Sequence, residues 1–217
     1  MKKEKLRKPP AAVLVALIAV IAAVGTTVAW LTAGQGLMDR FFSLSNFDTK
    51  ANIWFEGESP ITKNSDGTIT VDVINQDAAN YIGKLRVNAL YTGRGKAYLR
   101  VKMIQQWTDA GGTVLNTNVL LPFVVSSPYL PDDTGDQNKW FDNRLDDYCF
   151  YYAAKISSSA NGTYDTIPVI VAGLDTDRLA AVIPGGTVTL KIAVTLEAVQ
   201  VNRYPQFWGI DTLPWRS

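Results

Sequence analysis

Carboxylates are the side chains whose spacing in this sequence comes nearest to a chemical site. Six aspartates lie within the segment 126–147, which also holds Pro128 and Pro131. Carboxylate oxygens are the ligands that calcium prefers, but their spacing here does not follow an EF-hand loop. A solvated surface loop accounts for the same residues, so we assign no metal site. The aspartates are Asp132, Asp133, Asp136, Asp142, Asp146 and Asp147.

Two further sets of residues are of types found in carbohydrate-active proteins. Glu56 and Glu58, near Asp66, supply carboxylates of the kind that glycosidases use in pairs, but their spacing gives no support beyond chance. Tryptophans can line a carbohydrate groove, yet packing in the core or at an interface explains large aromatic side chains better. The tryptophans concerned are Trp107, Trp140, Trp208 and Trp215.

The chain contains no histidine. This excludes Ser-His-Asp and Cys-His catalysis, and it excludes metal centres that need histidine ligands. The only cysteine, Cys149, lies in the aromatic run 148–152, so no disulfide can form within the chain. We interpret Cys149 as a small buried hydrophobic residue rather than a reactive thiol. The sequence therefore predicts a protein that is not an enzyme and that needs no cofactor.

The N-terminus has the layout of an export signal. A cluster of five basic residues is followed by an unbroken apolar block from Ala11 to Val24. Small residues occupy the first and third positions before the bond between Ala29 and Trp30, where a signal peptidase would cut. We therefore predict that residues 1–29 form a signal peptide. The predicted cleavage site comprises Val28, Ala29 and Trp30.

An uncleaved signal anchor is the alternative interpretation. The apolar block is shorter than the roughly 20 residues that cross a bilayer as a helix, but extending it to Ala33 just reaches that length. In both cases the basic end stays inside and the chain after Trp30 lies outside the cytoplasm. An exported chain without disulfides fits the surface of a Gram-positive-type bacterium.

The charge and the length of the mature chain limit its possible partners and its number of domains. The formal net charge of +1 includes the signal, and residues 30–217 retain 16 basic and 19 acidic side chains. A mildly acidic chain gives no support for nucleic-acid binding, which usually requires a basic patch. The remaining length suits one domain with a sizeable core.

Alternation of apolar and polar residues is the main structural signal after residue 47. The clearest run is 187–198, where Val188, Leu190, Ile192, Val194, Leu196 and Ala198 share one face. The runs 67–75 and 97–104 alternate in the same way. Further strands are predicted over 50–56, 83–91, 113–125, 147–156 and 167–172.

These patterns predict an all-β fold, an antiparallel jelly-roll-like β-sandwich over residues 48–217, preceded by the N-terminal signal helix. Short helices are predicted near 37–45 and 174–181, and the segment 126–147 is predicted to be a long surface excursion. Residues 30–47 form an apolar N-terminal arm that directly follows the predicted cut. The arm is free to pack on its own domain or on a neighbouring molecule.

Four stretches, in this order along the chain, resemble the TasA/camelysin family. They are Gly25–Thr32 at the predicted cut, Arg94–Lys102, the aromatic run Asp147–Tyr152, and Thr195–Asn202 followed by Phe207-Trp208-Gly209. Members of this family are exported proteins whose signals are cut by a SipW-type signal peptidase. The resemblance implies a jelly-roll subunit of a biofilm-matrix or cell-surface fibre, which associates with copies of itself. A membrane-anchored monomeric binding module is the alternative, and a camelysin-like protease is the less favoured one, because without histidine a zinc site would need carboxylates alone.

In that family the freed arm adds as a strand to the next subunit, an arrangement called donor-strand complementation. An arm supplied by another molecule satisfies the unpaired edge of an open sandwich. The resemblance implies that membrane contact is limited to the signal before cleavage. It also makes the apolar residues of the arm candidate anchors of the donor strand. These are Trp30, Leu31, Met38, Phe41 and Phe42.

The export prediction is tested by N-terminal sequencing of the protein from its native host. We expect the extracellular protein to begin at Trp30. A protein that stays in the membrane fraction and retains its first residues would instead establish the uncleaved anchor.

Overall fold

A computed structural model describes residues 47–57, 61, 63–93, 95–115, 119–157, 165–183 and 189–217. Residues 1–46 lie outside the described residues, and they include the predicted signal, the cleavage site, the arm anchors and the helix near 37–45. Phe47, the last residue of the predicted arm, begins the first strand. No helix among the described residues is both long enough and apolar enough to span a membrane.

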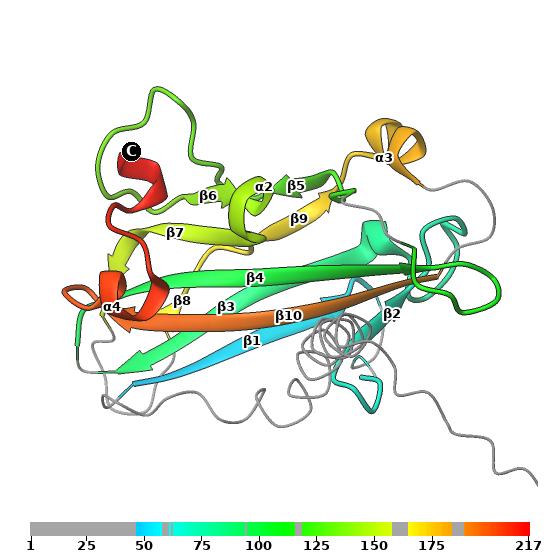
Figure 1. The fold of residues 1–217 in the computed structure, drawn as a ribbon, viewed down its shortest axis with the longest axis horizontal. Helices are drawn as coiled ribbons and strands as arrows, with labels where there is room; N and C mark the ends of the chain where they lie inside the picture. The colour runs from blue at the N-terminus through cyan, green and yellow to red at the C-terminus, as the bar shows by residue number, and fades with distance from the viewer. Residues whose placement is uncertain are drawn as a thin grey trace, which may run out of the picture.

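The described residues form two antiparallel β-sheets that pack face to face (Figure 1), which confirms the prediction of an all-β sandwich. The strands of each sheet pair in an order that differs from their order in the sequence. The first sheet contains, in spatial order, β1 (Phe47–Phe55), β3 (Leu85–Gly93), β9 (Val171–Leu174) and β5 (Phe123–Val125), with β8 (Asp165–Thr166) also on β3. The second contains β2 (Ile69–Val71), β10 (Thr189–Gln200), β4 (Ala97–Thr108), β7 (Cys149–Ile156) and β6 (Trp140–Asn143).

Short helices connect or cover these strands. The helix α3 (Thr176–Val182) confirms the prediction near 174–181, and the Asp175 carboxylate caps it by accepting a hydrogen bond from the Arg178 amide at 3.1 Å. The others are η1 (Ile82–Lys84), α2 (Arg144–Asp147), α4 (Tyr204–Trp208) and η2 (Pro214–Arg216).

The main core lies between the sheets and follows the predicted alternation. β4 and β10 pair along twelve residues of each strand, from Thr189 opposite Thr108 to Gln200 opposite Ala97. The apolar positions of both strands face the first sheet and are buried. They are Leu190, Ile192, Val194 and Leu196 of β10, with Ala97, Leu99, Val101 and Met103 of β4.

Two predicted strands are shorter than expected. The run 67–75 yields only β2, because the Asp72 carboxylate accepts hydrogen bonds from the Ile74 and Asn75 amides and turns the chain away. The run 113–125 yields only β5 at its end. Its start belongs to a turn in which the Asp109 carboxylate accepts a hydrogen bond from the Thr113 amide at 2.8 Å.

Two other predictions need correction. The strand expected over 167–172 begins at Val171, since Pro168 lacks the amide that a ladder requires. The segment 126–147 is not wholly a surface excursion, because it contains β6 and α2. β6 pairs with β7, and the Trp140 indole donates a hydrogen bond to the Pro168 carbonyl at 3.0 Å from a buried position.

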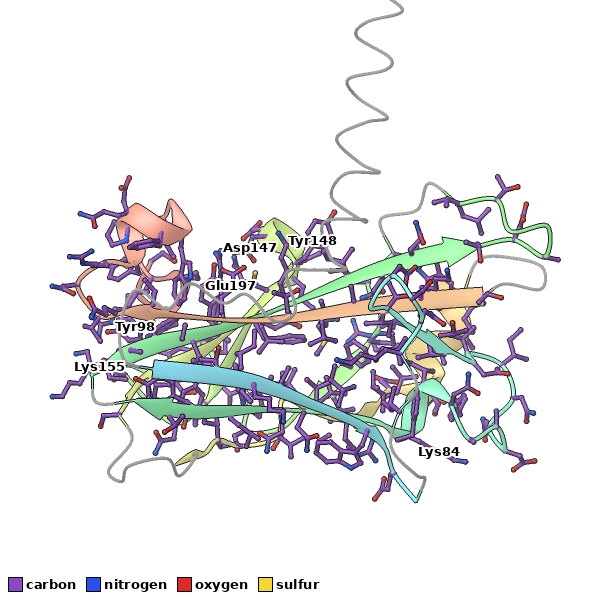
Figure 2. The ribbon with its side chains drawn as sticks, turned by 90° about the horizontal axis from the view of Figure 1, so that it is seen from below. Lys84, Tyr98, Asp147, Tyr148, Lys155 and Glu197 are labelled. Carbon is purple, nitrogen blue, oxygen red and sulfur yellow. The ribbon has the colours of Figure 1, made fainter. Side chains whose placement is uncertain are left out.

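The second sheet is also buried on part of its outer face. The side chains of Tyr98, Tyr151 and Val199 point away from the main core, yet the chain after β10 covers them. We call this covering segment, residues 201–217, the C-terminal strap. Figure 2 shows the strap on the side of the second sheet that faces away from the first sheet. A second hydrophobic cluster thus lies outside the sandwich.

The ladder between β4 and β10 gives a stability prediction. Leu196 is fully buried in the main core, so we expect Leu196→Ala to lower the free energy of unfolding by about 2–5 kcal/mol. Its neighbour Thr195 points the other way, and Thr195→Ala is expected to cost less than about 1 kcal/mol. Denaturant unfolding of both variants measures the difference. Equal effects would contradict the burial of Leu196, and a larger effect of Thr195→Ala would mean that the two faces of β10 are exchanged.

Candidate functional site

The structure separates the clustered aspartates rather than joining them into one site. Asp133 pairs with Lys139 at 2.7 Å, and Asp142 pairs with Arg144 at 2.8 Å. Asp147 accepts hydrogen bonds from the Cys149 amide at 3.0 Å and the Tyr151 hydroxyl at 2.5 Å. Within the described residues, no three carboxylates or thiols come close enough to hold a metal ion.

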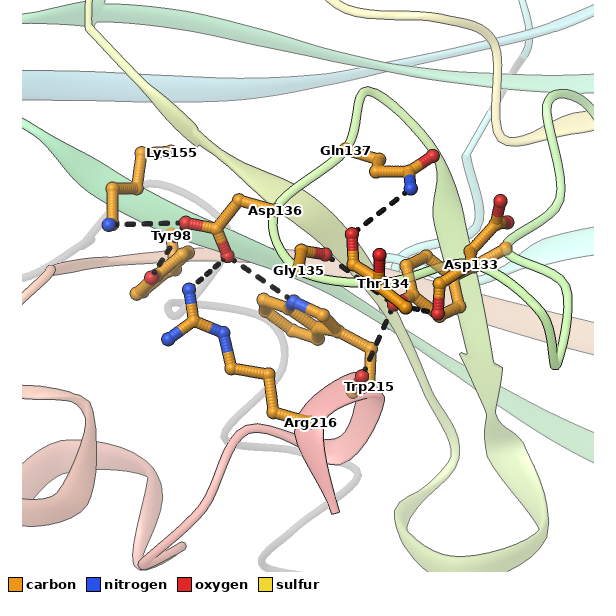
Figure 3. A network of polar contacts seen from close by, with 10 residues as sticks. Tyr98, Asp133, Thr134, Gly135, Asp136, Gln137, Lys155, Trp215 and Arg216 are labelled. Carbon is orange, nitrogen blue, oxygen red and sulfur yellow. Dashed lines mark hydrogen bonds and ion pairs between the residues drawn. The ribbon is translucent and has the colours of Figure 1, made fainter.

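Asp136 is the centre of the densest polar network, shown in Figure 3. Its carboxylate pairs with Arg216 at 2.5 Å and with Lys155 at 3.2 Å. It also accepts weaker hydrogen bonds from the Trp215 indole and the Tyr98 hydroxyl, at 3.4 and 3.3 Å. The residue stands in an exposed loop, but its side chain is only 20% exposed. This network fastens the C-terminal strap to the second sheet.

The environment of Asp136 favours its charged form. Burial opposes ionisation, but the hydrogen bonds from Arg216 and Lys155 outweigh it, so the pKa of the carboxyl is lowered. The same contact with Asp136 raises the pKa of Arg216. Burial, followed by the negative charge of Asp136, raises the pKa of the Tyr98 hydroxyl. Asp136 is therefore a structural anion.

A second network lies under α4, around Arg100. The guanidinium pairs with Glu197 at 2.7 Å, contacts the Tyr151 hydroxyl at 3.3 Å and stacks over the Trp208 ring, 4.9 Å from its centroid. Burial raises the pKa of the Tyr151 hydroxyl well above its usual value. Arg100, Glu197, Tyr151 and Trp208 thus form one connected network between β4, β10, β7 and α4.

Cys149 is buried against this network, as the sequence predicts. Burial, reinforced by the nearby charge of Asp147, raises the pKa of its thiol to about 12. A thiol with this pKa is protonated at neutral pH and is a poor nucleophile.

The structure places the carboxylates and tryptophans that the sequence analysis weighed as carbohydrate-site residues in other contacts. Glu56 forms an ion pair with Arg86, whereas Asp66 holds Thr68 and Lys191, and Glu58 lies outside the described residues. Trp107, Trp140 and Trp215 are buried in the two hydrophobic clusters, as their interpretation as packing residues predicts.

On one side of the sandwich, two strand edges have no partner among the described residues. β1 is the last strand of the first sheet and pairs only with β3 among the described strands. β10 pairs with β2 only from Leu190 to Ile192, so within the described residues its edge from Ala193 to Gln200 has no partner. β1 lies beside β10 (Figure 1). We call the edge of β1 together with Ala193–Gln200 the open seam.

The core is incompletely covered at the open seam. Ala51 and Ile53 of β1 point inward and pack on the main core, but both remain partly exposed. Ala198 of β10 likewise packs on the main core and remains partly exposed. Half-buried apolar side chains beside two strand edges that are unpaired within the described residues can receive an added strand, which would supply both hydrogen bonds and apolar cover.

Sequence patterns did not identify the open seam. The length of β10 is visible in its alternation, but the shortness of β2 depends on the turn at Asp72. The sequence-predicted site residues all belong to the signal and the arm, outside the described residues. Comparisons of the chain with protein-family models, curated proteins and solved structures found no match.

The network around Asp136 gives a prediction for the pH dependence of stability. A carboxyl whose pKa is lowered by folding stabilises the protein above its unfolded pKa of about 3.9, and this contribution is lost as the pH falls through the folded pKa. We expect Asp136→Asn to lower the free energy of unfolding at pH 7 by about 1–3 kcal/mol. The variant should also lose less stability than the wild type below about pH 5. Thermal unfolding across this range measures both effects.

Asp132→Asn is the matched control, because Asp132 is an exposed aspartate of the same loop with no partner among the described residues. It should leave both quantities unchanged. An Asp136→Asn protein with wild-type stability at pH 7 would show that the network does not hold the strap.

Proposed function

We propose that this protein is a non-enzymatic structural subunit of an extracellular biofilm-matrix or cell-surface fibre. The observation that carries the proposal is the open seam, where two strand edges and partly covered core residues lie together. An exposed edge of this kind is a liability unless something pairs with it. A strand donated by another copy of the chain is the occupant that the arm at residues 30–47 supports.

The chain geometry permits this exchange. The arm runs directly into β1, whose edge forms half of the open seam. A chain from residue 30 to residue 46 can extend about 55 Å, at up to about 3.3 Å per residue. The free part of β10 spans only about 26 Å. An arm can therefore leave its own subunit and cover a neighbour's seam, and repetition of this non-closing contact gives a filament.

The finer features of the proposal come from the sequence. We propose that the sandwich is of the jelly-roll kind, that residues 1–29 are a signal helix, and that a SipW-type peptidase releases the arm outside the membrane. Anchorage of the arm until cleavage would keep the subunits from assembling inside the cell. The lack of histidine and the protonated thiol of Cys149 support a role without catalysis.

The first test compares two purified forms by electron microscopy, one beginning at Trp30 and one lacking residues 30–45. We expect filaments from the first form only, because the second has no strand to donate. Filaments from both forms would contradict donor-strand exchange. Monomers from both, with an uncleaved native N-terminus, would favour a membrane-anchored surface binding module.

A second test addresses the seam itself. Ala198→Lys places a charged chain at the seam, whereas Thr195→Lys adds the same charge to the outward face of the same strand. We expect filaments from Thr195→Lys but not from Ala198→Lys. A synthetic peptide of residues 30–46, added in excess to the unaltered protein, should also stop filament growth, and it avoids any folding defect of the variant. Growth unaffected by the peptide would rule out the seam as the acceptor.

A further inference from the structure

Two short helices stand on the outer face of the second sheet, the face turned away from the first sheet (Figures 1 and 2). α2 follows β6, and α4 belongs to the C-terminal strap at the far end of β10. Each helix presents large apolar side chains to solvent. On α2, Leu145 is 90% exposed and the adjoining Tyr148 is 43% exposed, while on α4 Phe207 is 48% exposed.

The buried side chain of Arg144 holds α2 in place. The buried guanidinium of Arg144 donates hydrogen bonds to both carboxylate oxygens of Asp142 and to the Leu121 carbonyl, all at 2.8–2.9 Å. It also stacks on the rings of Phe123 and Phe150. A helix of four residues has little stability of its own, so these contacts hold α2 in place. The effect is to fix the position of Leu145, which packs on nothing beneath it.

Tyr148 adds a second sign of a functional surface. It ends α2 in the left-handed conformation, with φ of 63°, which glycine or asparagine usually adopts at this position. A bulky residue in this conformation is strained, yet the side chain is not buried in compensation. Figure 2 shows Tyr148 beside Asp147 on the outer face.

α4 is built in the same manner. Tyr204 and Trp208, four residues apart on one side of the helix, pack against Tyr98 and Tyr151 of the sheet. Phe207 points away from these contacts. Both helices thus use their inward side chains for attachment and carry an apolar residue outward.

The charges beside the two helices are opposite. Asp146 is exposed on α2, and Arg203 is exposed at the start of α4. Within the described residues neither forms an ion pair, whereas Arg100 with Glu197 and Arg216 with Asp136 are already matched. The outer face therefore has an apolar patch with an unpaired anion at α2 and an apolar patch with an unpaired cation at α4. The two patches are neighbours, because Tyr151 contacts both Asp147 of α2 and Trp208 of α4.

We propose that the outer face of the second sheet binds the same face of a second copy of this chain about a two-fold axis. In this pairing α2 of one copy lies against α4 of its partner, so each unpaired anion meets an unpaired cation and apolar residues meet at both of the symmetry-related contacts. Such a contact is self-complementary and closes at two molecules. It is separate from the open seam and does not rest on the proposed fibre.

The test is cysteine cross-linking of the full chain expressed in its native host. Leu145→Cys and Gln206→Cys, combined in one chain, place thiols on α2 and on the exposed surface of α4. The native Cys149 does not compete because it is buried. We expect mild oxidation to yield a dimer, about tenfold more than from either single variant. Pairing Leu145→Cys with Val114→Cys, an exposed site at the opposite end of β4, is the matched control and should yield no excess.

The charges are tested in the same cross-linking chain. Asp146→Arg and Arg203→Asp should each reduce the dimer about tenfold, because the two-fold axis repeats every reversed charge. The two reversals together should restore it, which a folding defect would not do. A ladder of higher oligomers in place of a dimer, or no recovery in the double reversal, would overturn the proposed two-fold contact.

Discussion

The ladder between β4 and β10 is the interaction on which the other parts of the molecule depend. It is twelve residues long, and both strands contribute an unbroken apolar face to the main core. No other described strand of the second sheet matches this length. β2 covers three residues of β10, and β7 pairs with the first half of β4. The open seam and the supported outer face both follow from one long ladder with shorter neighbours.

The core-facing side chains of the second sheet were predictable from the sequence, but the burial of its outer face was not. Alternation identifies Leu190 to Leu196 as core because the pattern needs no information beyond the strand itself. The same pattern predicts that Tyr98 points away from the core, but it does not predict whether Tyr98 is exposed or covered. Its burial depends on Trp215, more than a hundred residues later, and no local rule connects the two. The strap could be found only once the fold had brought both residues together.

Electrostatics explain how the described aspartates of the segment 126–147 are held. Each described aspartate of the 126–147 segment that is buried even partly has a hydrogen-bond donor within reach, and these donors come from different elements: Lys139, Arg216 and the Tyr151 hydroxyl. Charge in this region is neutralised locally, so it stabilises the loops and the strap. The aspartates that the sequence analysis assigned to a solvated loop serve in the structure to fix surface segments onto the sheet.

The open seam and the outer face would bind partners along different directions of the second sheet. Hydrogen bonds at a strand edge lie in the plane of the sheet, whereas side chains on its face point perpendicular to that plane. A strand added beside β10 would therefore leave α2 and α4 uncovered, and a molecule on the outer face would leave the edge of β10 free. The proposed seam contact would join unlike surfaces and could repeat without limit, while the proposed outer-face contact would join like surfaces and close at two. If both operate, filaments formed through the seam would be paired through the outer face, and a matrix would gain cross-links without needing a second kind of subunit.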